Sequence, residues 1–228
     1  MIANKMKLLI PALSAAAACL TISPSANATV VGILDINSTG TVTVTSTAIT
    51  FSGGDTTTAA TTLTYNSGTA LGTGVSGSLM NLTGTLPVNS FMTFTGTPLA
   101  FNLTAIGPGS ANTTCSGLAV GGSCSVFAGS PFILTLTTTG TAIALSVAGL
   151  VHDSTTVVST WMGDFTTQLA GETPAQIQAI FATPGGSLVA GFSGDFKAVT
   201  NVPEPNTAML LGAALLGLGV VIRRLTRS

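Results

Sequence analysis

Short runs in which an apolar residue alternates with threonine or serine recur between residues 30 and 170. The clearest is Thr41-Val42-Thr43-Val44-Thr45. Successive side chains of a β-strand point to opposite faces, so this period of two predicts strands with one buried and one wet face. Similar runs predict further strands at residues 91–95, 100–104, 133–137 and 142–147.

Glycine-rich turn signals separate these runs, and no helical pattern lies between them. The signals fall at residues 53–55, 66–68, 107–109 and 121–122. Short strands at this spacing favour an antiparallel β-sandwich or a jelly-roll-like domain. We therefore predict a mainly β domain over residues 29–200, with Val, Leu and Phe in the core and Thr on the wet face.

One short helix is predicted near the end of this domain. Thr173 offers an N-cap, Pro174 a first helical residue and Gln176 the third position of a capping box. Pro184 ends the helix, because proline cannot continue it. A final strand is predicted from 188 to 199.

Charge is scarce in this chain, at 6% of its 228 residues. Between residues 29 and 200 the only basic residue is Lys197, against six acidic residues, which gives a formal charge of −5. A nucleic-acid-binding protein needs a basic surface, so nucleic acid is excluded as a partner. Threonine, serine and glycine replace the charges, which leaves disorder as an alternative, but the richness in Val, Ile and Thr argues for a folded domain.

The N-terminus has the three parts of an export signal. Lys5 and Lys7 precede the apolar run 8–20, and Ala26 and Ala28 form an A-x-A cleavage site. This pattern predicts a signal peptide that ends at residue 28, with signal peptidase and the export machinery as partners. Two alternatives stay open, an N-terminal membrane anchor and lipidation at Cys19.

The C-terminus carries a second pattern. Val202-Pro203-Glu204-Pro205 precedes residues 207–222, which contain no charge, and Arg223, Arg224 and Arg227 follow. As a helix these sixteen residues would span about 24 Å, somewhat less than the roughly 30 Å hydrocarbon core of a membrane. The arginines are expected to stay on the cytoplasmic side. The pattern predicts a transmembrane helix over 207–222 with a basic end at 223–228.

Residues 202–228 resemble the PEP-CTERM sorting signal, the tail of proteins that exosortase handles in Gram-negative bacteria. The resemblance rests on the Pro203-Glu204-Pro205 triplet, the short apolar helix and the terminal arginines. It implies recognition at residues 202–205 and removal of the helix from an inner-membrane-anchored precursor. It also implies transfer to the outer envelope, cell surface or extracellular matrix, and a link to exopolysaccharide or biofilm. A plain C-terminal membrane anchor is the alternative.

Two cysteines, Cys115 and Cys124, follow the predicted signal peptide. An even pair in an exported chain predicts a disulfide, and a metal site would need more ligands than this pair. The region from Phe101 to Thr167 also resembles an uncharacterised domain that precedes such sorting tails, and this looser resemblance supplies no function.

No catalytic, cofactor or metal site is predicted. His152 and Asp153 could belong to a Ser-His-Asp arrangement, but adjacent strand residues point to opposite faces and would not pair. The acidic residues have no glycosidase or calcium-loop context. The acids weighed for calcium are Asp35, Asp55, Asp153 and Asp164.

Sugar binding is the main alternative function. It usually requires exposed aromatic platforms, and besides ten Phe only Trp161 and Tyr65 are available. We expect Trp161 to lie in the core. The sequence therefore predicts a non-enzymatic envelope or extracellular-matrix protein, with a carbohydrate-binding module or adhesin as the alternative and a hydrolase as a third hypothesis.

Overall fold

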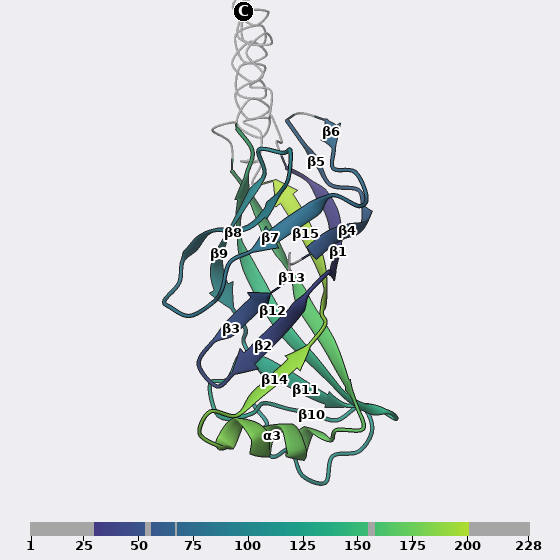
Figure 1. Cartoon of the computed structure of the whole chain (residues 1–228), viewed down its shortest axis with the longest axis vertical. Helices are drawn as coiled ribbons and strands as arrows, with labels where there is room; N and C mark the ends of the chain where they lie inside the picture. Colours follow the sequence, from purple (N-terminus) through teal and green to yellow (C-terminus); the bar gives the residue numbers. More distant parts are fainter. Residues whose placement is uncertain (1–29, 53–55, 67, 155–157, 201–228) are drawn as a thin grey trace, which may run out of the picture. The chain divides into compact units, whose positions relative to one another are not determined.

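The computed structural model describes residues 30–52, 56–66, 68–154 and 158–200 (Figure 1). The predicted signal peptide and the predicted sorting tail lie outside these residues. The regular structure of the described part is β apart from one short helix, as the sequence patterns predicted.

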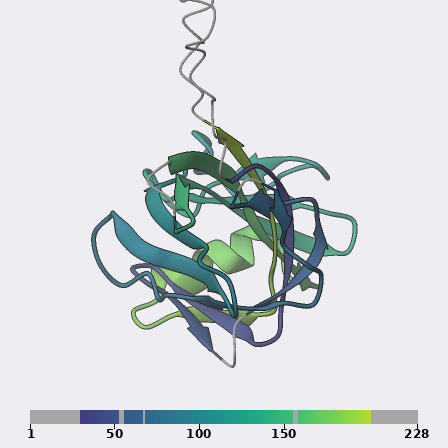
Figure 2. The same ribbon diagram turned by 90° about the horizontal axis from the view of Figure 1, so that it is seen from above.

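Eight of the described strands pair antiparallel in a closed ring (Figure 2). In ring order they are β12 (Gly140–His152), β13 (Val158–Ala170), β15 (Ser193–Thr200), β1 (Gly32–Ser38), β4 (Thr56–Thr61), β7 (Ser76–Leu79), β8 (Val88–Phe94) and β9 (Ala100–Ile106). Pairing of β9 with β12 closes the ring. The domain is therefore a β-barrel, and the predicted sandwich or jelly roll is wrong.

Closure depends on β12. One of its edges pairs with β13 along the whole strand. Its other edge pairs first with β11 (Phe132–Leu136), through residues 141–145, and then with β9, through residues 147–152. The barrel closes only over the β9 half, and beyond it β11 and β10 (Ser123–Cys124) extend the sheet.

A second, three-stranded antiparallel sheet has the order β14-β2-β3. It consists of β14 (Ser187–Ala190), β2 (Thr41–Thr45) and β3 (Ile49–Ser52). In Figure 1 it lies in front of the β11 end of the long strands. A small hairpin, β5 (Thr64–Tyr65) with β6 (Thr69–Ala70), completes the strands of the described residues.

The predicted final strand is divided in the structure. Its first part, β14, pairs with β2 in the small sheet, and its second part, β15, pairs with β13 and β1 in the barrel. The chain passes from one sheet to the other at Phe192. The carbonyl oxygen of Phe192 accepts the backbone N–H of Ser38, and the backbone N–H of Phe192 donates to the Ser38 hydroxyl. The prediction of one strand was wrong because both parts carry the same apolar alternation.

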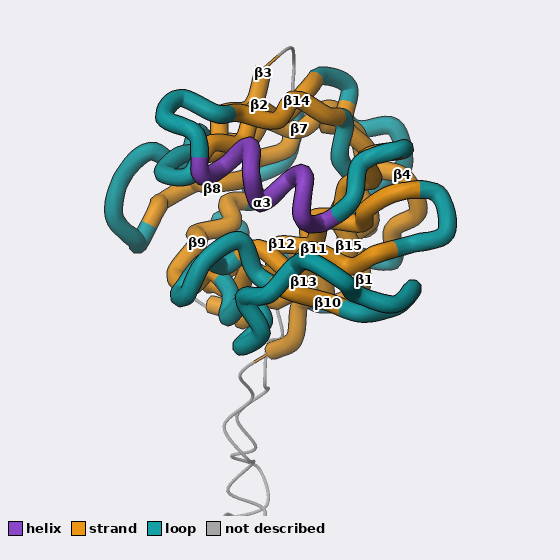
Figure 3. The backbone as a smooth tube through the Cα atoms, turned by 90° about the horizontal axis from the view of Figure 1, so that it is seen from below, coloured by secondary structure: helices purple, strands orange, loops and turns teal. Residues whose placement is uncertain are grey.

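The predicted helix is confirmed as α3 (Pro174–Ala182). Thr173 and Gln176 form the reciprocal capping box, and Thr183 follows the last helical residue. Pro174, Ile177 and Phe181 are its buried residues. Figure 3 shows α3 across one end of the domain, beside β11.

An aromatic cluster fills the barrel. Trp161 is 1% exposed and its ring centroid lies 5.7 Å from that of Phe101 and 5.6 Å from that of Phe196. Its indole nitrogen donates to the carbonyl oxygens of Asn102 at 3.1 Å and Leu150 at 3.2 Å. The indole ring is thus packed against other aromatic rings, and its N–H is hydrogen-bonded inside the protein. This confirms the expected core position of Trp161.

Candidate functional site

An apolar pocket lies between the small sheet and the long strands. One wall consists of Val42, Val44, Ile49, Phe51, Leu188 and Ala190 from β2, β3 and β14. The other consists of Phe132, Ile143, Leu145, Phe165, Thr166, Thr167 and Leu169 from β11, β12 and β13. Phe181 of α3 and Phe192 complete it, and the cavity measures about 50 Å³.

The alternation of the strands produces this lining, because each strand turns its apolar residues to the same side. Aromatic edges fix the two walls against each other. The ring of Phe51 lies 5.3 Å from Phe192 and 6.1 Å from Phe165, centroid to centroid. Aromatic rings at these separations, inclined to each other, attract edge to face. These contacts hold the two walls together beside the cavity.

Thr166 and Thr167 are the two polar residues of the lining, and other groups already bind their hydroxyls. Thr167 Oγ1 donates to the carbonyl oxygen of Gly191 at 2.6 Å. Thr166 Oγ1 lies 3.0 Å from Ser193 Oγ. The lining therefore offers little to water or to a polar ligand and suits apolar groups.

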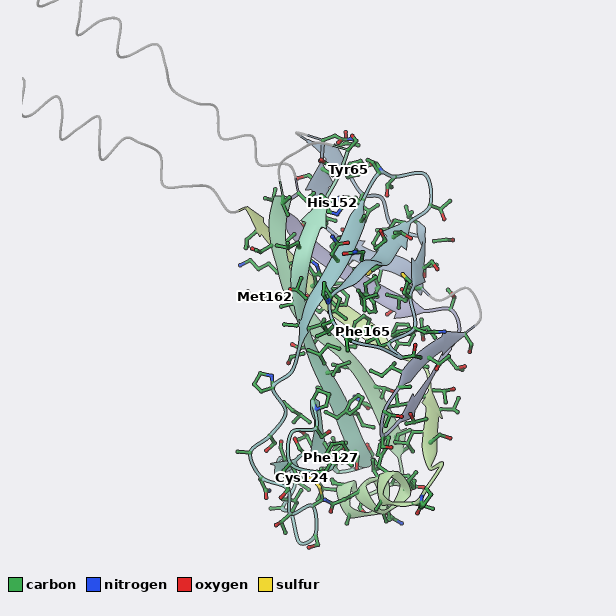
Figure 4. All side chains as sticks on the ribbon, turned by 90° about the vertical axis from the view of Figure 1, so that its left-hand side faces the viewer. Tyr65, Cys124, Phe127, His152, Met162 and Phe165 are labelled. Carbon is green, nitrogen blue, oxygen red and sulfur yellow. A yellow bond between two sulfur atoms is a disulfide. The ribbon has the colours of Figure 1, made fainter. Side chains whose placement is uncertain are left out.

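A wider groove of about 210 Å³ adjoins the pocket. Ile49, Phe132 and Phe181 line both spaces. The groove adds the turn 45–48 and Phe127, whose side chain is 45% exposed. Figure 4 shows Phe127 beside Cys124, at the end of the domain opposite His152 and Tyr65.

The disulfide region and α3 adjoin the groove. The structure contains the predicted Cys115–Cys124 bond, with Cα atoms 5.3 Å apart. Gln178 Nε2 of α3 donates to two carbonyl oxygens of this region, at 2.9 Å and 2.8 Å. The Phe132 and Phe181 rings stack with centroids 6.2 Å apart. These contacts tie the helix to the loop around the disulfide.

The candidate catalytic residues His152 and Asp153 each bind a group of another strand or turn. His152 Nε2 lies 3.1 Å from the side-chain amide of Asn102. Asp153 is 4% exposed, and its Oδ2 accepts the backbone N–H of Asn66 at 2.7 Å. The carboxylate thus holds the turn after β5.

Three of the aspartates that are scattered in the sequence lie in one row on the barrel exterior. Asp35 of β1 is paired with Asp195 of β15, which is paired with Asp164 of β13. Asp164 accepts a hydrogen bond from the Ser146 hydroxyl of β12. Oδ1 of Asp35 is covered and has no hydrogen-bond partner. Burial, and then the Asp195 carboxylate, raise the pKa of Asp35 above its ordinary value.

Within residues 30–52, 56–66, 68–154 and 158–200, no group of three or more His, Cys, Asp or Glu side chains is placed to hold a metal ion. Of the acids weighed for calcium, Asp35 and Asp164 belong to the row, Asp153 lies elsewhere, and Asp55 falls outside the described residues.

The residues of the predicted export and sorting signals also lie outside the described residues. They are Ala26, Ala28, Val202, Pro203, Glu204, Pro205, Arg223, Arg224 and Arg227. Residues 201–224 match the family model of the PEP-CTERM protein-sorting motif. The chain carries this sorting motif. The PEP-CTERM motif implies an exported surface protein that is processed at the membrane, with exosortase as the processing partner.

Comparison of the chain with curated proteins and with solved structures gave no significant match. Among the residues that the structure describes, none of the helices is long and apolar enough to cross a membrane. The predicted transmembrane helix 207–222 is not among them.

The pocket is the feature that sequence reasoning missed. Its residues, such as Val42, Val44 and Leu145, carry the same alternation as ordinary core residues. Local patterns contain no signal for the space, because it depends on how two layers meet.

Proposed function

We propose that this PEP-CTERM protein is delivered by exosortase to the outer envelope or extracellular matrix, where its barrel domain has a non-enzymatic role linked to exopolysaccharide or biofilm. The motif match supports this proposal. The match begins at residue 201, directly after β15 ends at Thr200. Cleavage within the tail would therefore leave the described barrel strands intact.

The surroundings of the candidate catalytic residues support a non-enzymatic role. His152 is bonded to an amide group, and the Asp153 carboxylate is bonded to a backbone N–H. A catalytic histidine instead requires a nucleophile on one ring nitrogen and an orienting acid on the other.

Sorting is tested by expressing the full chain in strains with and without exosortase, then measuring the mass and location of the product. We expect a shorter, outer-envelope or extracellular product only in the strain with the enzyme. Pro203→Ala should block this processing. Pro98→Ala is the matched control, because Pro98 is an exposed proline about 100 residues before the motif in the sequence. An intact C-terminus in both strains would contradict the proposal.

A carbohydrate-binding role is the second candidate. Trp161 and Tyr65 are 1% and 9% exposed, so neither forms a sugar-binding platform. The observation that favours this role is the exposed Phe127 in a groove that contains hydroxyl groups. We expect Phe127→Ala to weaken retention of the protein on the host polysaccharide, and Val120→Ala, at another exposed apolar side chain, to leave it unchanged. Equal retention of all three proteins would remove this candidate.

A further inference from the structure

We propose that the pocket and groove together bind a single-chain amphiphile with an uncharged, hydroxyl-bearing head group. The alkyl end would occupy the apolar pocket, and the head group would lie in the adjoining groove. This inference is independent of the proposed sorting function.

The pocket selects the apolar end. Its volume of about 50 Å³ is several times the roughly 10–15 Å³ that one water molecule needs. Water that entered would find few partners, because Gly191 and Ser193 already bind the hydroxyls of Thr167 and Thr166. Apolar spaces with few polar partners hold water poorly and favour apolar ligands. The aliphatic and phenyl side chains around the space therefore fit an alkyl chain.

The groove selects the head group. Ser46 and Thr47 are exposed along its turn, beside Thr45. Thr45 Oγ1 already accepts the N–H of Ala48 at 2.9 Å, so Ser46 and Thr47 supply the available hydroxyls. Among the described residues that line the two spaces, none is charged. A carboxylate or phosphate head would lose hydration without gaining an ion pair, whereas a sugar or glycerol head can exchange hydrogen bonds.

The position of the shared residues supports a continuous site. Ile49, Phe132 and Phe181 contribute to both spaces. The exposed Phe127 and the half-buried Pro131 continue the apolar surface into the groove. An amphiphile lying along this surface would place its alkyl chain against the apolar side chains and its head group beside the hydroxyls of the groove.

The first experiment measures chain-length dependence. The full chain is expressed in an exosortase-carrying strain, purified without detergent, and titrated calorimetrically with hexyl, heptyl and octyl glucoside below their micelle concentrations. We expect saturable one-site binding with affinity rising about fourfold per methylene, the factor that corresponds to burial of one CH₂ group. Absence of saturable binding, or affinity independent of chain length, would overturn the proposal.

The second experiment fills the pocket. Ala190 lines it, whereas its neighbour Val189 is 59% exposed on the other face of β14. We expect Ala190→Leu to weaken octyl glucoside binding at least tenfold and Val189→Leu to leave it unchanged. Thermal unfolding checks that both variants are folded. Wild-type affinity in folded Ala190→Leu would show that the amphiphile binds elsewhere and would overturn the proposal.

The third experiment tests the head group and does not depend on changes in the core. Ser46→Lys places a cation at the groove, and it should raise the affinity for octanoate relative to octyl glucoside at least threefold at low salt. An unchanged ratio would overturn the placement of the head group. Co-sedimentation with phosphatidylcholine vesicles separates a free amphiphile from a lipid surface. Vesicle binding without binding of monomeric glucosides would overturn the proposal in favour of a membrane.

Discussion

Asp35 gives the sharpest test of the barrel's electrostatics. It is half-buried on the outside of β1, directly opposite Asp195, and Asp164 continues the row on β13. Lys197 lies two residues from Asp195 along β15 and is paired with Ile33 rather than with an acid. Replacing Asp35 by Asn keeps the shape of the side chain and removes one charge. We expect Asp35→Asn to stabilise the protein at neutral pH.

The size of the effect follows from two costs. Like charges directly opposite on paired strands destabilise by about 0.2–1 kcal/mol. Partial burial also costs the charged carboxylate hydration that the uncharged amide of Asn does not lose, but only one oxygen of the half-buried Asp35 is covered. We therefore expect a gain of about 1 kcal/mol at pH 7, equivalent to a rise in Tm of about 2–4 °C for a domain of this size.

The pH dependence has a definite sign. Because burial and Asp195 raise the pKa of Asp35 above its ordinary 3.8, the folded chain binds this proton more tightly than the unfolded chain. The wild-type protein loses stability relative to Asp35→Asn as pH rises from about 3.8 through the folded-state pKa, and the deficit is complete above that value. Below pH of about 3 both states are protonated, and the two proteins should be equally stable with respect to this residue.

Urea unfolding at pH 3 and pH 7 measures this difference. The cycle formed by Asp35→Asn, Asp195→Asn and the double variant separates the two costs, because Asp195→Asn removes the repulsion and leaves the covered oxygen. Destabilisation of Asp35→Asn at pH 7, or an equal effect at both pH values, would refute the reasoning.

Three further variants test the packing, the disulfide and the helix cap. Gly149→Ala should destabilise by more than about 3 kcal/mol, because its Cβ would lie 1.8 Å from a carbonyl oxygen of β9 and 2.9 Å from Trp161 Nε1. Chemical denaturation measures the loss, and near-wild-type stability would contradict this packing. Reduction of Cys115–Cys124, or its replacement by two serines, should cost about 2–4 kcal/mol; a thiol assay that finds two free thiols without reductant would contradict the bond. Thr173→Ala should cost about 1 kcal/mol by removing the N-cap, with Thr173→Ser as the control that retains it.

Local features could be predicted from the sequence because their causes are local. The capping box needs only Thr173, Pro174 and Gln176 within four residues, and the strand 41–45 needs only its own alternation. The sorting motif was likewise predicted from neighbouring residues, and the family match covers residues 201–224.

Barrel closure could not be predicted in this way. A sandwich and a barrel use the same alternation, and they differ only in which edges pair. Here the decision rests on pairs such as Ile106 with Val147 and Ala100 with His152, which are about 40 to 50 residues apart. The same reason hid the aspartate row, because Asp35, Asp164 and Asp195 meet only through strand register.

Threonine further weakens any prediction of which side chains face inward. Thr56, Thr58 and Thr141 are buried, with exposures of 0%, 3% and 1%. Their hydroxyls donate to backbone carbonyl oxygens at 3.0, 2.7 and 2.6 Å. The exposed Thr104 donates in the same way to the carbonyl oxygen of Ala148 at 3.3 Å. A threonine can therefore take either face, provided a carbonyl is in reach.

The same chemistry explains how a chain with so few charges can cover a barrel. Threonine has the branched side chain that suits a strand, and a hydroxyl that binds its neighbour's backbone. Such a surface is wet and nearly neutral, apart from the row formed by Asp35, Asp195 and Asp164. A nearly neutral surface attracts charged partners weakly at long range. We therefore expect any recognition by this domain to depend on short-range shape, hydroxyl contacts and apolar burial, which the proposed site in the pocket and groove combines.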